Sequence, residues 1–254
     1  MTAGYGVSAV LHLETCGSTN KEAMRLAHSG ETGPLWVCAR LQSEGRGRSG
    51  RKWVSKQGNL FASLLVRLKG PMENLGQLSL VAGIAVADAI TLALTERGEQ
   101  KQVGKLWLKW PNDIMFGPAK CGGLLVETST SQHDEVANIV IGVGLNLAHG
   151  ANLEDRATSC LSDHGLEILP TEILAYLDQA MLLRLHQWDR GNGFSAIRAS
   201  WLAMAGKAGR PITVHEGANV IKGRFEGLSQ EGRLLVRLDG GTVKEIAWGD
   251  VLFP

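Results

Sequence analysis

A long apolar segment near the middle of the chain limits the possible folds most strongly. Residues 78–94 read LSLVAGIAVADAITLAL, an alanine-rich run that contains one charged side chain, Asp88. A helix that crosses a membrane needs about 20 consecutive apolar residues, and this run is shorter. A helix that is apolar on all sides is stable when other elements cover it. We therefore expect a helix buried against a sheet, and no association with a membrane.

Short apolar runs on either side of this segment predict the strands of the sheet. Each run is bounded by loop residues, glycine or proline, as strands in globular proteins commonly are. The expected strands cover residues 35–41, 59–68 and 105–116, the last broken at Pro111, together with GGLLVETS (122–129) and NIVIGVGLNL (138–147).

Helical patterns occur before and after these strands. In STNKEAMRLAHSG, Thr19 can cap a helix with Glu22 as its capping-box partner, and Gly30 can end it. Apolar residues at helical spacing predict a second helix over residues 170–189. A shorter helix is expected over residues 194–204.

The composition changes near the C-terminus. From Pro211 onward, β-type runs such as ITVHEG and LLVRLDGG alternate with glycine turns. This pattern is typical of a small barrel of about five short strands. We place a boundary at residues 205–210 and predict two domains, 1–206 and 207–254.

Charge and cysteine content exclude several classes of protein. The chain has 254 residues and a formal net charge of +1, so any basic surface for an anionic partner must be local. Its four cysteines lie far apart and form no CxxC pair, which argues against a zinc site and a disulfide framework. No basic stretch followed by an apolar run opens the chain, so we expect no signal peptide and a cytoplasmic protein with reduced thiols.

One basic, glycine-rich segment, GRGRSGRKWVS (45–55), stands out in this nearly neutral chain. We call it the Gly/Arg loop. Its spacing matches the GxGxxG motif of dinucleotide-binding folds, but no amphipathic helix follows it. The acidic residue expected about 20 positions later does not end a convincing strand. We therefore discount a Rossmann site, and the sequence has no P-loop motif.

The chemistry of the Gly/Arg loop suits an aromatic nucleotide. Glycines let backbone N–H groups approach an anion closely, and arginines match phosphate oxygens with forked donors. Trp53 adds a flat face on which a base can stack. Two other interpretations fit the composition as well: a solvated basic turn, and a loop that contacts an RNA backbone.

Three further motifs carry residues that could hold a ligand. KWPNDI (109–114) presents Asn112 and Asp113 in a turn, KCGGLLVE (120–127) places Lys120 before two glycines, and GVGLNL (142–147) ends a strand with Asn146. Each also has an ordinary structural interpretation: a proline turn, a solvated lysine, and a bulge at a strand end.

Together these motifs resemble those of the biotin–protein ligases. GRGRSGRKW, KWPND, KCGGLLVE and IGVGLNL occur in the family's order and spacing, with GSTN (17–20) before them. The C-terminal GRFEGLSQEGRLLVRLDGGTVKEIAWGDV resembles the small cap of the same family. The resemblance covers essentially the whole chain. It departs from the family at Ser49, where many relatives carry another arginine, and this leaves one fewer charge to retain an adenylate.

The resemblance implies an α+β fold. Its catalytic domain would be a mixed sheet flanked by helices, related to class II tRNA synthetases, followed by a C-terminal SH3-like β-barrel. It also implies an ATP-dependent ligase that acts in two steps. Biotin and Mg-ATP form biotinyl-5′-AMP and pyrophosphate, and a specific lysine of a biotin carboxyl carrier protein then takes the biotinyl group and releases AMP.

The resemblance further implies a role for individual residues. Lys120, Arg48 and Asp113 would be catalytic, with Asp113 also an indirect Mg²⁺ partner and an aid to deprotonation of the acceptor lysine. The biotin site would comprise Ser18, Thr19, Asn20, Gln42, Gly45, Arg46, Lys120, Gly122 and Gly123. The ATP and adenylate site would comprise Arg48, Arg51, Trp53, Lys109, Asn112, Gly142, Gly144 and Asn146.

Family members differ in assembly and in added domains. Homodimers are common among them, so a homodimer is one expectation for this chain. Some carry an N-terminal helix-turn-helix and repress transcription. Ser18 lies too close to Met1 for such a domain to fit, so we expect no DNA-binding domain.

Two other functions are alternatives at this stage. A nucleic-acid-binding module would pair the Gly/Arg loop with a small barrel and would bind RNA in a salt-dependent way, although the near-neutral charge argues against it. A lipoate or octanoyl ligase shares the catalytic fold but would need a long apolar groove and would lack this loop. Biotin-dependent exchange of pyrophosphate into ATP, compared with lipoate, distinguishes all three.

Overall fold

The computed structural model describes residues 7–69, 72–130, 136–151 and 157–253. Its larger sheet has the strand order β1-β2-β3-β7-β6-β5-β4. β1 pairs with β2 in parallel and the other neighbours are antiparallel, so the sheet is mixed, as predicted. The strands are β1 (Ala9–Cys16), β2 (Leu35–Gln42), β3 (Leu60–Lys69), β4 (Leu106–Lys109), β5 (Asp113–Phe116), β6 (Ala119–Thr130) and β7 (Val136–Leu145).

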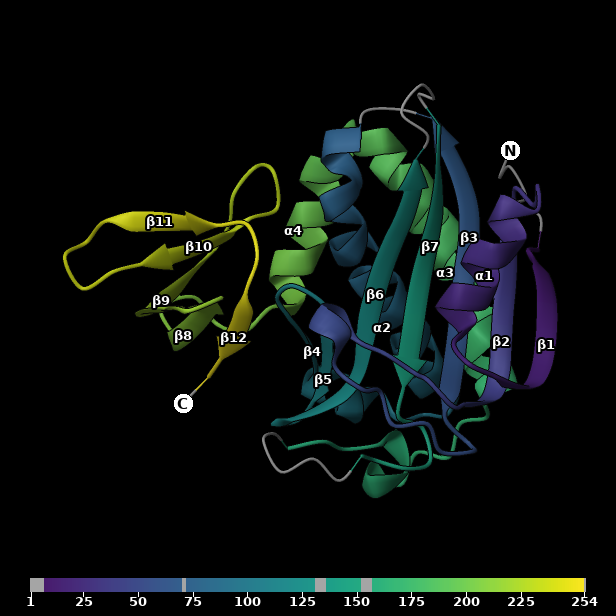
Figure 1. Cartoon of the computed structure of the whole chain (residues 1–254). Coiled ribbons are helices and arrows are strands. Elements are labelled where there is room, and N and C mark those ends of the chain that lie inside the picture. The colour runs from purple at the N-terminus through teal and green to yellow at the C-terminus, as the bar shows by residue number, and fades with distance from the viewer. Residues whose placement is uncertain (1–6, 70–71, 131–135, 152–156, 254) are drawn as a thin grey trace, which may run out of the picture.

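Helices cover both faces of this sheet. α1 (Thr19–His28) lies on one face against β2, β3 and β7. α2 (Leu78–Glu96) and α3 (Pro170–Trp188) lie on the opposite face, with α4 (Phe194–Met204) packed against both (Figure 1). The predicted helices over residues 170–189 and 194–204 are confirmed.

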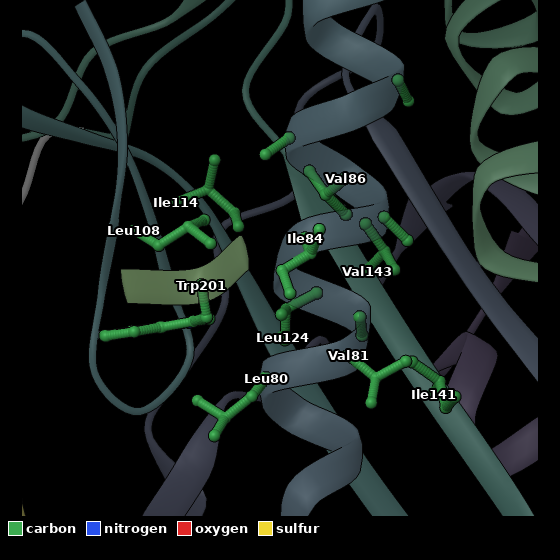
Figure 2. Close-up of a cluster of buried hydrophobic side chains, with 14 of the residues drawn as sticks. Leu80, Val81, Ile84, Val86, Leu108, Ile114, Leu124, Ile141, Val143 and Trp201 are labelled. Atoms are coloured by element: carbon green, nitrogen blue, oxygen red, sulfur yellow. The ribbon is translucent and has the colours of Figure 1, made fainter. Parts of the chain in front are cut away.

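Helix α2 is the centre of the hydrophobic core, as its sequence predicts. Leu80, Ile84 and Val86 are each 2% exposed or less. A fully buried side chain of this size contributes about 1.5–3 kcal/mol relative to an exposed one. Figure 2 shows the α2 side chains packed against side chains of the sheet and of α4; the labelled partners are Leu108, Ile114, Leu124, Ile141, Val143 and Trp201.

The same helix is also the one membrane-span candidate among the described residues. Residues 74–96 are long and apolar enough to cross a bilayer, and 72% of their most apolar 18-residue window is buried inside the protein. The burial of α2 against the sheet accounts for its apolar composition.

Pro111 separates two short strands, as predicted. Because proline lacks a backbone N–H, the chain turns there and β5 returns antiparallel to β4. The register places Lys109 directly opposite Asp113. The turn therefore brings a cation and an anion together at one end of the sheet.

Strand β1 is an element that the sequence analysis does not predict. It forms an edge of the sheet and has one partner, β2. Leu11 and Leu13 are half-buried, whereas His12 and Glu14 are exposed. This alternation is the signal of an edge strand with one covered face.

The predicted capping box of α1 is wrong by one residue. The N-cap is Ser18, with an extended backbone, and Thr19 is already helical. The Thr19 hydroxyl contacts Gln42 and Ser63, and Glu22 instead pairs with Arg25 at 2.6 Å. Gly30, with a φ of +99°, ends the helix as predicted.

The C-terminal residues form a separate antiparallel sheet in the order β11-β10-β9-β8-β12. This agrees with the five short strands predicted there. The strands are β8 (Pro211–Glu216), β9 (Asn219–Leu228), β10 (Leu234–Arg237), β11 (Val243–Ile246) and β12 (Asp250–Leu252). β12 reaches the Gly/Arg loop, since Arg51 and Asp250 form an ion pair at 2.7 Å.

Candidate active site

A cavity of about 410 Å³ lies between the sheet, the Gly/Arg loop and β12. Its walls come from the start of α1, the end of β2, the turn between β4 and β5, the first half of β6 and the end of β7. Every predicted site residue except Gly45 and Gly122 lines it. This volume is typical of a site for a small molecule.

One end of the cavity carries uncharged polar groups. Ser18 and Thr19, at the start of α1, are each 4% exposed. Gln42, at the end of β2, accepts the Thr19 backbone N–H through Oε1 at 2.8 Å. The Thr19 hydroxyl lies 3.1 Å from the same oxygen. We call this the neutral end; its groups suit a ligand that donates and accepts hydrogen bonds without charge.

Two residues that the sequence analysis misses lie behind the neutral end, outside the cavity lining, and hold its residues in place. Ser63, fully buried in β3, has its hydroxyl oxygen 2.7 Å from that of Thr19 and 2.6 Å from Asn20 Oδ1. Glu127 of β6 accepts hydrogen bonds from Asn20 Nδ2 at 2.8 Å and from Arg46 Nη2 at 2.9 Å. The sequence carries a signal for each of them. Ser63 is a polar residue in an otherwise apolar strand, and the two-residue period of a strand places Glu127 on the same face as Gly123.

The opposite, cationic end holds a buried ion cluster. Asp113 is 9% exposed, and Lys109 Nζ lies 2.9 Å from its Oδ2 while Lys120 Nζ contacts its Oδ1. Burial opposes ionisation of Asp113, but the ammonium groups of Lys120 and Lys109 outweigh it and hold the pKa of this carboxyl below its ordinary value. Asp113 is therefore a weak base, which argues against its predicted role in deprotonating an acceptor lysine.

The Gly/Arg loop brings two arginines to the cationic end. Arg48 donates from Nη1 to Asn112 Oδ1 and from Nη2 to the Gly249 carbonyl, each at 3.2 Å. Arg51 donates to Asp250 Oδ1 at 2.7 Å. Burial lowers the pKa of Arg48, Asp250 opposes that shift and Arg51 adds to it. The guanidinium stays charged near neutral pH, so this end suits phosphate or carboxylate groups.

Trp53 packs closely on glycines of β6 and β7. A Cβ atom on Gly144 would lie 2.7 Å from Cε2 and Cζ2 of the indole, and one on Gly123 would lie 3.2 Å from Cζ3. Only glycine permits this approach without moving the ring. Lys120 Nζ lies 5.6 Å from the ring centroid, so the indole and this amine share one side of the cavity. The indole Nε1 is buried and has no hydrogen-bond partner among the described residues.

Two predicted nucleotide residues lie in different surroundings. A Cβ atom on Gly142 would lie 2.1 Å from Asn20 Oδ1, which places Gly142 at the neutral end. Asn146 donates from Nδ2 to the Ser159 carbonyl at 3.1 Å and lines the cavity after β7. The predicted nucleotide role therefore suits Asn146 better than Gly142.

The two predicted biotin residues outside the cavity lining have packing roles. Gly122 faces the other side of β6, where a Cβ atom would lie 2.5 Å from Leu145 Cδ2. Strand alternation explains this, because adjacent residues point to opposite faces. Gly45, the first residue of the Gly/Arg loop, is buried, and its carbonyl accepts the Trp53 N–H at 2.9 Å.

The described residues offer no group of three His, Cys, Asp or Glu side chains that could hold a metal ion. Both carboxylates at the cationic end, Asp113 and Asp250, pair with cations. Mg²⁺ keeps several waters and binds through one or two carboxylates plus substrate phosphates. The site therefore fits Mg²⁺ that enters with a nucleotide and meets the protein indirectly.

Two known protein families match this chain. Residues 14–146 match the biotin/lipoate A/B protein ligase family, and residues 208–253 match the biotin protein ligase C terminal domain. The two matches lie on the larger sheet and on the C-terminal sheet, respectively.

Individual proteins match over most of the chain. The biotin–[acetyl-CoA-carboxylase] ligase of Paracoccus denitrificans is 38% identical over 88% of this chain and 92% of its own. The bifunctional ligase/repressor of Escherichia coli is 30% identical over 91% of this chain and 70% of its own. The structure of the Aquifex aeolicus biotin protein ligase in complex with biotin and ATP aligns with a TM-score of 0.78 at 26% identity, over 97% of this chain and 98% of that one.

Proposed function

The chain belongs to the biotin/lipoate A/B protein ligase family, and from this premise we propose that its cavity performs both half-reactions of a biotin–protein ligase. The enzyme activates biotin with Mg-ATP to biotinyl-5′-AMP and transfers the biotinyl group to a biotin carboxyl carrier protein. The observation that carries the assignment of residues is the polarity of the cavity. A neutral end faces a cationic end, and Trp53 and Lys120 lie together on one wall.

Biotin fits this cavity in one orientation. Its ureido ring has two N–H donors and one carbonyl acceptor, which Ser18, Thr19 and Gln42 can pair without any charge. Its carboxylate then points to Lys120 at the cationic end. A reversed ligand would place an ionised carboxylate against uncharged groups, which is unfavourable in a buried site.

The first half-reaction joins two anions. A biotin carboxylate oxygen attacks the α-phosphorus of ATP, the bond from that phosphorus to the bridging oxygen breaks, and the electron pair leaves on pyrophosphate. Mg²⁺, bound to the nucleotide, supplies charge neutralisation at the phosphates. Lys120 and Arg48 offset the repulsion between the reactants and stabilise charge on the phosphoryl oxygens. Trp53 offers its face to the adenine base.

The second half-reaction needs orientation more than acid–base catalysis. The acceptor amine attacks the acyl carbon of the mixed anhydride, the acyl C–O bond breaks, and AMP leaves with the electron pair. The proton of the attacking amine passes to solvent or to the leaving phosphate, because the lowered pKa of Asp113 makes it a poor base. Asp113 instead fixes the positions of Lys109 and Lys120.

Three further expectations stay predictions: a cytoplasmic location, homodimerisation and the absence of operator binding. The assignment of residues 1–206 to catalysis and 207–254 to a C-terminal domain is also a proposal. It is supported by the link between α4 and β8, which joins the two sheets over residues 205–210.

A direct test is the exchange of labelled pyrophosphate into ATP by the purified protein. We expect exchange that depends on biotin and not on lipoate or octanoate, followed by biotinylation of a carrier domain at one lysine. Exchange supported by lipoate, or no exchange with any of the three acids, would overturn the assignment.

A further inference from the structure

We propose that Glu127 anchors the Gly/Arg loop through Arg46 and thereby keeps the loop over a bound adenylate. Glu127 lies on β6, outside the cavity lining, so it is a positioning residue that acts through the loop. The inference rests on the proposed function, because it concerns how that cavity retains its intermediate between the two half-reactions.

The two sides of the Gly/Arg loop hold each other near its base. Arg46 and Lys52 pair across the loop as an antiparallel bridge. Next to this bridge, the Trp53 N–H donates to the Gly45 carbonyl at 2.9 Å. We call these paired residues the stem of the loop. A contact that fixes Arg46 therefore also fixes the part of the loop that carries Trp53.

Glu127 binds Arg46 from a fixed position. Arg46 Nη2 lies 2.9 Å from Oε1 and 3.2 Å from Oε2 of the carboxylate. The buried Asn20 amide donates to the same carboxylate at 2.8 Å and to the Leu125 carbonyl at 3.1 Å. Asn20 thus orients Glu127 before Arg46 arrives, so little side-chain freedom of the carboxylate is lost in the contact.

The tip of the loop is held by contacts for which a ligand competes. Arg48 donates to Asn112 and to the Gly249 carbonyl, and Arg51 donates to Asp250. Both arginines line the cavity. Phosphate oxygens are strong acceptors for the same guanidinium groups, so the tip contacts change as the nucleotide enters and as pyrophosphate leaves.

The contact between Arg46 and Glu127 lies at the neutral end, where the proposed ligand carries no charge. A ureido ring offers no anion that could displace this carboxylate. The contact is therefore compatible with the empty enzyme, with both substrates and with the adenylate. After pyrophosphate leaves, one phosphate remains to hold the tip, and the stem contact takes a larger share in keeping the loop closed.

The test measures how long the enzyme keeps its adenylate. The protein is loaded with biotin, Mg²⁺ and ATP labelled at the α-phosphate, in the presence of pyrophosphatase. The complex is then separated from free nucleotide and chased with unlabelled biotinyl-5′-AMP. The side chains of Arg46 and Glu127 are 36% and 31% exposed, so the contact is of intermediate strength. We expect E127Q to lose the label roughly three- to tenfold faster than the wild type.

Variants of Arg46 separate the loop contact from the Asn20 contact. R46M removes the cation but leaves Glu127 bound to Asn20. It should lose the label as fast as E127Q, and the double variant should be no faster than either. R46K keeps a cation without the forked donors and should retain the label longer than R46M. Wild-type retention in R46M would show that Glu127 acts through Asn20, and additive effects would show that the two residues act separately; either result overturns the proposal.

Limited proteolysis of the ligand-free protein reports on the loop itself. E127Q and R46M should be cleaved within residues 45–55 faster than the wild type, because both lose the stem contact. Cleavage at the wild-type rate in both variants would show that this contact does not hold the loop, and would overturn the proposal.

The matched control is E14Q, which removes the same charge elsewhere on the larger sheet. Glu14 pairs with Arg40 at 3.0 Å between β1 and β2, and neither lines the cavity. This variant should retain the label as long as the wild type. Failure of the wild type to form any adenylate would refute the proposed function. A wild type that forms the adenylate, with E127Q that keeps it equally long, would refute this inference alone.

Discussion

The substitution Asp113→Asn tests whether the cationic end depends on one buried carboxylate. The Asp113 carboxylate lies between Lys109, at 2.9 Å, and Lys120. All three side chains are 18% exposed or less. Asparagine has nearly the same shape but no charge. The substitution therefore leaves two buried ammonium groups with no counter-charge between them.

The expected cost follows from this burial. Removing one partner of a buried ion pair typically costs about 3–5 kcal/mol, because the remaining charge stays desolvated. At roughly 2–4 °C per kcal/mol for a domain of this size, the melting temperature should fall by about 6–20 °C. Thermal unfolding followed by circular dichroism measures this directly.

The matched control is Asp88→Asn. Asp88 pairs with Arg184 at 2.7 Å between α2 and α3, but its side chain is 35% exposed. Water reaches Asp88 more easily than Asp113, so losing its charge should cost less, and this variant should melt closer to the wild type than D113N does. If D113N were as stable as D88N, Asp113 would not be the carboxylate that neutralises the buried Lys109 and Lys120.

The pH dependence of the same variant has a definite sign. The pKa of Asp113 in the folded protein is below its ordinary value of 3.8, so the unfolded state takes up the proton first as the pH falls. The stability from this carboxylate is therefore complete above about pH 3.8 and is lost as the pH falls through the folded pKa. The difference in stability between the wild type and D113N should be constant near neutral pH and should shrink below pH 3.8. A difference that grew on acidification would refute the assignment.

Anionic ligands should partly rescue D113N. With the carboxylate removed, phosphates can neutralise Lys109 and Lys120, so Mg-ATP should raise the melting temperature of D113N more than that of the wild type. A ligand at about 100 times its Kd stabilises the protein by about 2.7 kcal/mol. An equal shift in both proteins would show that these lysines do not meet the nucleotide.

Three other predictions concern the Gly/Arg loop and the indole beneath it. Trp53→Ala should raise the KM for ATP by roughly 5- to 150-fold, the equivalent of about 1–3 kcal/mol for one stacked base; an unchanged KM for ATP in pyrophosphate exchange would show that adenine does not stack there. Gly144→Ala should lower kcat/KM at least about tenfold because its Cβ would lie 2.7 Å from the indole. The control Gly104→Ala has open space around the added atom and should match the wild type. Equal activities of the two variants would contradict the close packing of Trp53 on Gly144. Residues 45–55 should resist limited proteolysis once biotin and ATP are added, because a glycine-rich loop over a reactive anhydride should close to exclude water; cleavage at the same rate with saturating ligands would refute this closure.

Much of the fold follows from patterns that the sequence carries locally. The apolar run at residues 78–94 predicts α2, because a helix that is buried on all sides has no polar face. Pro111 predicts the break between β4 and β5 because it lacks a donor. The sequence analysis does not predict β1, which is a half-exposed edge strand. Its apolar and polar residues alternate only weakly, so its sequence resembles that of a loop until its pairing with β2 is known.

The candidate site divides in the same way. Residues in motifs rich in charge or glycine, such as the Gly/Arg loop and KCGGLLVE, can be predicted as candidate site residues from the sequence alone. Ser63 escapes notice because its hydroxyl matters only through Thr19 and Asn20, which lie 43 or more positions away along the chain. Gly122 lies outside the cavity lining because it faces the other side of β6, and the sequence alone does not state which face it occupies. The sequence analysis also misses Asp250, because this residue belongs to the C-terminal sheet whereas its partner Arg51 lies in the Gly/Arg loop.

The most direct test of the central claim is a crystal structure of the protein with biotinyl-5′-AMP bound. We predict the ureido ring within hydrogen-bond distance of Thr19 and Gln42, and the phosphate beside Lys120 and Arg48. An adenylate bound outside this cavity, or bound with its ureido ring at the cationic end, would contradict the account.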